Sequence, residues 1–169
     1  DICLWNFDYE EAIGYLDEIE QTIIGLVNSS DWFSIFYPGN SIEGIFELQY
    51  NDALSQSNSL YSATFTADEY KASAKVVELL STETAREFVR GGGSFRESDS
   101  KIWKYCGSRN DASSLRPSSD RASANWIFYR YADVLLMKAE ALSQSGDLPG
   151  ATEYLNKVRE RALMQPISI

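Results

Sequence analysis

Hydrophobic residues recur every three or four positions near both ends of the chain, which is the spacing of an amphipathic helix. Ala12, Leu16, Ile19 and Ile23 form one such stripe. The stripe predicts a helix over residues 8–27 that buries one face against the rest of the fold.

Two capping-box patterns mark predicted helix starts. Asp8 with Glu11 opens the first helix, and Thr66 with Glu69 opens another over residues 66–80. In each pair, the first side chain can accept a hydrogen bond from a free backbone N–H, and the glutamate can reach back to the cap. We therefore expect two helices in the first half of the chain.

The C-terminal end predicts a helical hairpin. One apolar stripe covers residues 130–145 and a second covers residues 148–163, with a break at Gly146 between them. Pro149 fits the first turn of the second helix, where a missing N–H costs nothing. The stripe residues are Ala132, Leu135, Leu136, Ala139, Leu142, Ala151, Leu155 and Val158.

The pattern of residues 8–19 recurs at residues 147–158, with the spacing of a tetratricopeptide unit. One helical hairpin cannot bury its own apolar face, so neighbouring hairpins must cover it. We expect a mostly α fold: residues 1–27 end a truncated hairpin, residues 28–125 form a loop-rich insertion, and residues 126–169 form the second hairpin. The first and last pairs of helices are expected to share one layer.

The truncated hairpin carries a further expectation. Leu4 and Trp5 would be the last turn of a helix that is cut off, and they would continue the apolar face of Ala12 and Leu16. That face is expected to lack its partner within these 169 residues.

The insertion carries short strands and turns. Residues 45–50 are rich in apolar and aromatic side chains and predict a strand, and residues 101–105 predict a shorter one. Residues 51–65 are rich in Ser and Asn and predict a loop. Gly91, Gly92 and Gly93 lack the Lys and Ser/Thr of a phosphate-binding loop, so they predict a flexible connection.

Charge and composition exclude several classes of function. The net charge is −10, and residues 1–70 contain thirteen acids and no base, which disfavours binding to nucleic acid or to an anionic membrane surface. The chain has no His and two Cys, so we expect no zinc site, no Ser-His-Asp or Cys-His nucleophile and no cofactor. Glu43 and Glu47 are about 13 Å apart on a strand, too far for a retaining glycosidase pair.

Several blocks together resemble the SusD/RagB family. The segment from Tyr129 to Leu142 resembles its signature helix, and Asn156 to Ala162 resembles the Asn-x-Val-Arg-x-Arg-Ala continuation. Upstream, Asn40 to Asn51 resembles an Asn-x-x-Glu-x-Ile-Phe-x-x-Gln-Tyr strand, and Lys104-Tyr105 resembles a Lys-Tyr pair that often precedes the signature. Thr84-Ala85-Arg86 departs from the family's Asp-x-Arg.

The resemblance implies that residues 1–169 are part of a SusD-like α/α domain with no enzymatic role. Such proteins bind glycans or other nutrients at the bacterial outer surface, held by a lipid anchor that this chain does not carry. They deliver the ligand to a TonB-dependent transporter of the SusC type. The alternative function is a tetratricopeptide scaffold that binds proteins, which the repeat alone would predict.

Sugar binding requires exposed aromatic faces flanked by polar groups. Tyr61 and Trp103 are the candidate stacking residues, because both lie in the insertion, near Asn58 and among the scattered basic residues Arg96, Lys101 and Arg109. Trp126 is expected in the core. The charged residues of the signature blocks are expected to make caps and ion pairs: Arg130, Asp133, Glu140, Arg159 and Arg161.

Overall fold

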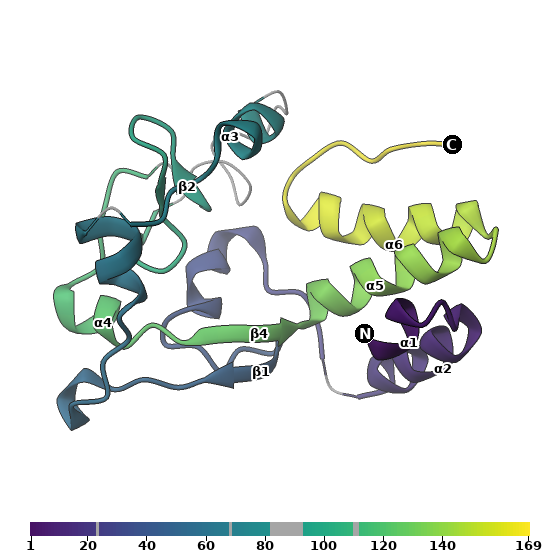
Figure 1. The fold of residues 1–169 in the computed structure, drawn as a ribbon, viewed down its shortest axis with the longest axis horizontal. Coiled ribbons are helices and arrows are strands. Elements are labelled where there is room, and N and C mark those ends of the chain that lie inside the picture. Colours follow the sequence, from purple (N-terminus) through teal and green to yellow (C-terminus); the bar gives the residue numbers. More distant parts are fainter. Residues whose placement is uncertain (23, 68, 82–92, 110–111) are drawn as a thin grey trace.

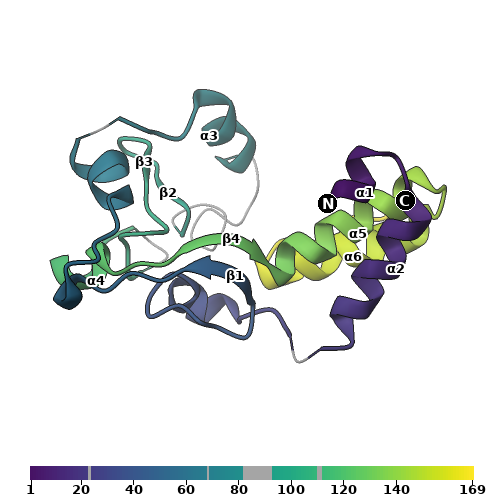
Figure 2. The same ribbon diagram turned by 60° about the horizontal axis from the view of Figure 1, so that its bottom comes forward.

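The chain folds into a helical layer and a loop-rich half, joined by a strand that runs directly into a helix (Figures 1 and 2). The computed structural model describes residues 1–22, 24–67, 69–81, 93–109 and 112–169. The joining elements are β4 (Trp126–Arg130) and α5 (Tyr131–Gln144). The other elements of the layer are α1 (Ile2–Trp5), α2 (Tyr9–Glu20) and α6 (Leu148–Arg161).

The predicted C-terminal hairpin is confirmed, since α5 and α6 lie antiparallel and side by side (Figure 1). Helix α5 begins at a capping box in which the Asp133 carboxylate accepts from the backbone N–H of Arg130 at 2.9 Å. Helix α6 begins where the Asp147 carboxylate accepts from the N–H of Gly150 at 3.0 Å. The break between them is Gly146, whose φ of 90° is a backbone conformation that glycine adopts readily and other residues rarely do.

Helices α1 and α2 pack on α5, so the expectation of an open apolar face is wrong for three of its four residues. Leu4, Ala12 and Leu16 are all buried. Leu4 and Ala12 form one cluster with Ala141 of α5. Trp5 is the exception, with an exposed fraction of 79%.

Helix α2 ends at Glu20, seven residues earlier than predicted. The backbone N–H of Val27 donates to the Glu43 carboxylate at 2.9 Å, and the N–H of Gly25 donates to Ile42. These bonds tie Gly25 and Val27 to residues 42–43, so their N–H groups cannot continue the helix. Ile23 lies outside the described residues.

The predicted helix at 66–80 is displaced. The structure has a helical turn at Ser62–Thr66 and then α3 (Ala74–Ser81). Between them, Lys71 forms a β-bridge with Lys101, and the N–H of Ala72 donates to Ser100 at 2.9 Å. Residues 71–72 therefore pair with residues 100–101 instead of continuing a helix. Asp68, within the second capping-box segment, lies outside the described residues.

The predicted strand at 45–50 is β1 (Gly44–Leu48), which pairs antiparallel with β4. The sequence did not predict β4, and Trp126 at its start is 40% exposed rather than core. Beyond this sheet, β2 (Phe95–Arg96) pairs with β3 (Lys101–Ile102). The remaining short elements are η1 (Ser29–Ile35), η2 (Asp52–Leu54) and α4 (Ser118–Ala122).

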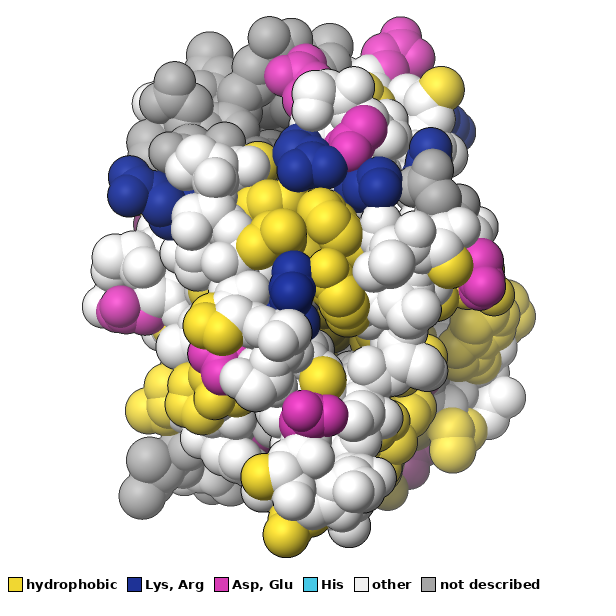
Figure 3. All heavy atoms as spheres, turned by 90° about the vertical axis from the view of Figure 1, so that its left-hand side faces the viewer, with side chains coloured by type: hydrophobic (Ala, Val, Ile, Leu, Met, Phe, Trp, Pro, Cys, Tyr) yellow, Lys and Arg dark blue, Asp and Glu magenta, His cyan; other side chains and the backbone are white. Residues whose placement is uncertain are grey.

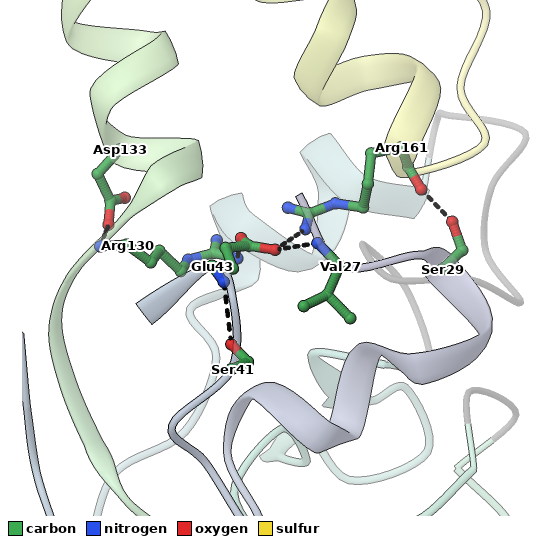
Figure 4. Close-up of polar contacts among 7 residues, drawn as sticks. All are labelled: Val27, Ser29, Ser41, Glu43, Arg130, Asp133 and Arg161. Atoms are coloured by element: carbon green, nitrogen blue, oxygen red, sulfur yellow. Dashed lines mark hydrogen bonds and ion pairs between the residues drawn. The ribbon is translucent and has the colours of Figure 1, made fainter. Parts of the chain in front are cut away.

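A buried carboxylate joins the two halves (Figure 4). Glu43, before β1, is 0% exposed and accepts from Arg130 Nη1 at 2.8 Å and from Arg161 Nη1 at 2.6 Å. Both guanidinium groups also lie over the ring of Trp32, at 5.2 and 5.3 Å from its centroid. One acid therefore holds the start of α5 and the end of α6 against η1.

A second buried ion group fixes α2 against the hairpin. Lys138 of α5 is 5% exposed and donates to Asp17 and Glu20 of α2. Tyr131 and Tyr154 also donate to Glu20, at 3.0 and 3.1 Å. Burial by itself would raise the pKa of Glu20, but the hydrogen bonds from Lys138 and the two tyrosines outweigh it and lower the pKa.

We predict that Glu43→Gln lowers the free energy of unfolding by about 3–5 kcal/mol, because the buried guanidinium of Arg161 and the half-buried one of Arg130 lose their counter-charge. Chemical denaturation monitored by circular dichroism measures this loss. The control is Glu153→Gln, which removes an exposed i,i+4 pair with Lys157 and should change the free energy by less than about 0.5 kcal/mol. A loss of the same small size for Glu43→Gln would contradict the role of this carboxylate.

The lowered pKa of Glu20 predicts acid sensitivity. A carboxyl whose folded pKa lies below its ordinary value of 4.5 stabilises the fold above that pH. This stability is lost as the pH falls through the folded pKa. In Lys138→Met, burial of Glu20 persists while its cationic donor is gone, so its pKa should rise. Denaturation curves between about pH 7 and pH 3 should show a flatter acid loss in the variant; equal slopes would argue against this cluster.

Candidate functional site

A group of aromatic and basic side chains lies at the end of the molecule opposite the helical layer. We call it the aromatic-basic cluster; its members are Tyr61, Phe65, Arg96, Lys101, Trp103 and Arg121. Figure 3 shows this end of the molecule, where hydrophobic side chains gather in the middle of the face with Lys and Arg beside them.

The aromatic members are positioned by one helical turn and by β3. Tyr61 and Phe65 are four residues apart, so their rings lie on the same side of the turn and stack at 5.5 Å between centroids. Phe65 also contacts Trp103, which follows β3, at 5.9 Å. The three rings thus form a row from the surface toward the interior.

Three separate segments bring basic side chains onto these rings. Arg96 of β2 and Lys101 of β3 lie 5.0 and 4.8 Å from the ring centroid of Phe65. Arg121 of α4 lies 4.2 Å from that of Tyr61. Cations at these distances are attracted to the negative ring faces.

Trp103 is buried, so the expectation of an exposed stacking ring at this position is wrong. Its exposed fraction is 1%, and its indole N–H donates to the carbonyl of Arg109 at 3.2 Å. A Cβ added at Gly107 would lie 1.9 Å from the indole nitrogen, so the ring fits only against a glycine. Trp103 therefore packs against Phe65 from the interior of the fold.

Tyr61 is half-buried at the surface of the cluster, as a contact residue must be. Arg96 and Lys101 lie over the ring of Phe65, on which Tyr61 stacks. Asn58 does not offer its amide to a ligand, because its Nδ2 donates to Ala124 at 2.6 Å and its Oδ1 accepts from Leu60 at 2.7 Å. Arg109 is exposed.

The electrostatics of the cluster are dominated by cations, with one clear ion pair. Arg96 donates to both carboxylate oxygens of Asp99, at 2.9 and 2.5 Å. The hydrogen bond from Arg96 lowers the pKa of Asp99, and Asp99 raises that of Arg96. Lys101 donates to the carbonyl of Phe65 at 2.7 Å.

A separate cavity of about 420 Å³ lies between β4, β2 and α3. Lys104 lines it, and burial followed by the charge of Arg130 lowers its pKa. Its aromatic walls include Trp32 and Phe36, which belong to the core under α6. The cavity therefore adjoins the structural ion network rather than the exposed rings.

Within the described ranges, no group of three or more His, Cys, Asp or Glu side chains is placed to hold a metal ion. No helix in the described part of the chain is long and apolar enough to cross a membrane. Burial raises the pKa of the Cys106 thiol to about 12, so this thiol is a poor nucleophile.

Comparison with known proteins gives consistent matches. The model of the SusD family matches residues 94–169. SusD-like protein P38 of Formosa agariphila is 43% identical over 65 residues, which are 38% of this chain and 12% of that protein. A SusD homolog from Bacteroides thetaiotaomicron has a TM-score of 0.64 at 22% identity, over 95% of this chain and 38% of its own. A SusD superfamily protein from Bacteroides vulgatus has the same score and identity, over 99% and 42%.

Residues 94–169 belong to the SusD/RagB family, and the chain as a whole has the fold of the two SusD-like structures. Its fold is the mostly α SusD-like fold, and it spans 38–42% of the two solved chains. The family model covers Arg96, Lys101, Trp103 and Arg121. Tyr61 lies outside that match, where the likeness to the solved structures at 22% identity shows the fold alone.

Four of the five signature residues make the structural contacts expected of them. Arg130 and Arg161 hold Glu43, and Asp133 caps α5. Arg159 donates to the carbonyl of Gln165 at 3.0 Å. Glu140 is exposed on α5, and its expected structural role stays a prediction.

Two cluster members were not predicted by the sequence. Phe65 lies in a segment that was predicted to be a loop. It stacks on Tyr61 because the two residues are four positions apart on a helical turn that was not predicted. Arg121 lies in a Ser-rich stretch, sixty residues away from the ring that it contacts. That spacing could have signalled Phe65; no local pattern could have signalled Arg121.

We predict that Trp103→Ala lowers the free energy of unfolding by about 3–5 kcal/mol, because it leaves a large cavity under the cluster. Thermal and chemical denaturation measure the loss. Trp126→Ala is the matched control, since that ring is 40% exposed and its removal should cost less. Equal losses for the two variants would contradict a supporting role for Trp103.

Proposed function

We propose that this chain is part of a non-catalytic protein that binds glycans at the bacterial outer surface, with the aromatic-basic cluster contacting the sugar. The observation that carries the proposal is that Tyr61 and Phe65 form a half-exposed aromatic pair with basic side chains beside it, in a chain whose residues 94–169 match the SusD family. Sugar sites combine apolar ring surface with a few convergent polar groups.

The rest of the proposal follows the family. The full-length protein would be held to the outer membrane by a lipid anchor and would pass its ligand to a TonB-dependent transporter of the SusC type. Helices α5 and α6 would serve as scaffold and would not touch the sugar, because the cluster lies at the other end of the molecule (Figure 1). We also propose that the chain consists of the end of a truncated hairpin (residues 1–27), a loop-rich insertion (residues 28–125) and a C-terminal hairpin (residues 126–169).

One observation favours the alternative, a protein-binding scaffold. Phe46, Phe128 and Trp126 stack in a row on the β1–β4 sheet, with exposed fractions of 52%, 49% and 40%. An exposed apolar patch of this kind is typical of a surface that binds another protein.

We predict that Tyr61→Ala in the full-length protein weakens glycan affinity by roughly 5- to 150-fold, the range for losing one aromatic contact of about 1–3 kcal/mol. A glycan array first identifies a ligand, and calorimetry then measures its affinity. Tyr70→Ala is the control, because Tyr70 is an exposed tyrosine of the same segment and lies outside the cluster. The melting temperature should stay the same for both variants.

Unchanged affinity for Tyr61→Ala would rule out this residue as a sugar contact. Unchanged affinity together with loss of a protein partner on Phe128→Ala would favour the scaffold function instead. If Tyr61→Ala lowered the melting temperature strongly, Tyr61 would be a packing residue.

A further inference from the structure

We propose that the aromatic-basic cluster selects acidic saccharides, glycans that carry carboxylate or sulfate groups, and that Arg121 is the group that binds the anion. This inference rests on the proposed function, since it names the class of glycan that the same cluster takes. It is carried by two observations: the protein's own side chains engage the ring faces, and one cation of the cluster has no counter-charge among the described residues.

The ring faces of the cluster are already in use. Tyr61 stacks on Phe65 with an angle of 17° between the rings, and the guanidinium of Arg121 lies over Tyr61. Arg96 and Lys101 lie over Phe65. A neutral sugar binds an aromatic residue by laying its C–H groups on an open face, whereas this cluster offers half-exposed cations braced by rings. Recognition by charge therefore fits the geometry better than recognition by stacking.

Arg121 differs from the other two cations. Arg96 is paired with Asp99, and Lys101 donates to a backbone carbonyl. In the described part of the chain, the Arg121 side chain makes no hydrogen bond or ion pair, and its Nε is buried without a partner. The carboxylate of its neighbour Asp120 accepts from Ser119 at 3.1 Å. A half-buried guanidinium without a counter-charge favours an incoming anion.

The guanidinium is also held in place before any ligand arrives. Contact with the Tyr61 ring at 4.2 Å restricts the Arg121 side chain, so less conformational entropy is lost on binding. Its planar fork matches the paired oxygens of a carboxylate or a sulfate ester. These two groups share one chemistry, and acidic sugars carry either.

The charge of the whole chain makes this local arrangement selective. The net charge is −10, and residues 1–70 contain thirteen acids and no base. At physiological salt, charges act over a Debye length of about 8 Å, so a nearby cation outweighs distant acids. A polyanionic glycan would be repelled by the acidic residues 1–70 and attracted where Arg121 and its neighbours lie.

The test compares matched probes on the full-length protein. Oligogalacturonate and its fully methyl-esterified form have the same backbone and differ in carboxylate charge. Carrageenan oligosaccharides before and after desulfation form the corresponding sulfate pair. Calorimetry is run on all four, beside neutral gluco-, manno- and xylo-oligosaccharides, at about 0.05 M and about 0.5 M NaCl. We expect at least one acidic probe to bind, its neutral counterpart to bind at least about 10-fold more weakly, and added salt to weaken the acidic probe.

Three variants locate the charge. Arg121→Gln should weaken the acidic probe by roughly 10- to 100-fold, the range for one hydrogen bond to a charged group. Lys157→Gln, which removes a cation from α6, should change the affinity by less than about 2-fold. Asp99→Asn removes the acid that neutralises Arg96 and should tighten the acidic probe, an effect that a purely structural role of the cluster would not produce. Should Asp99→Asn prove unstable, the Arg121→Gln result decides.

The outcomes separate the two proposals. Glycan binding that depends on Tyr61 but is equal for charged and neutral forms, or is unchanged in Arg121→Gln, overturns this inference and leaves the proposed function standing. Failure of every probe and of every glycan on the array overturns the proposed function, and this inference with it.

Discussion

The fold depends on one buried carboxylate, that of Glu43. It has no exposure to solvent, and it accepts from the guanidinium groups at the start of α5 and the end of α6, and from the backbone of Val27. A charge so placed is tolerated only when it is fully paired. Those three partners come from segments that are up to 134 residues apart in sequence, so this single acid sets how the helical layer meets the loop-rich half.

The position of the cluster follows from the same acid through a chain of backbone contacts. Glu43 precedes β1, β1 pairs with β4, and α4 with Arg121 lies just before β4. Asn58, which is buried, then ties the turn that carries Tyr61 to α4, since its N–H donates to Ala122 at 2.6 Å and its amide to Ala124. The position of α4 before β4 therefore places Arg121, and the hydrogen bonds of Asn58 to the end of α4 place the ring of Tyr61 beside it.

Sequence reasoning succeeded where structure is local and failed where it depends on distant partners. The apolar stripes of α2, α5 and α6 identify helices because a helix that buries one face carries apolar residues every three or four positions. The early end of α2 depends on the bond from Val27 to Glu43, and the late start of α3 on pairing of residues 71–72 with residues 100–101. The predicted exposures of two tryptophans were wrong for a similar reason. Trp103 was expected to be exposed but is buried, because Gly107 has no side chain to block its ring, and Trp126 was expected in the core but lies on an exposed sheet face.

The same motif, arginine over an aromatic ring, occurs twice in this chain with opposite electrostatic outcomes. At Trp32, two guanidinium groups lie over the indole and both form ion pairs with the buried carboxylate of Glu43, so this group stabilises the fold. At Tyr61, the guanidinium of Arg121 lies over the phenol at a shorter distance, and no carboxylate of the described residues meets it. The ring braces the cation in both places. Under the proposed function, the Tyr61 group differs from the Trp32 group because no carboxylate of the described residues pairs with its guanidinium, and an acidic ligand would supply that partner.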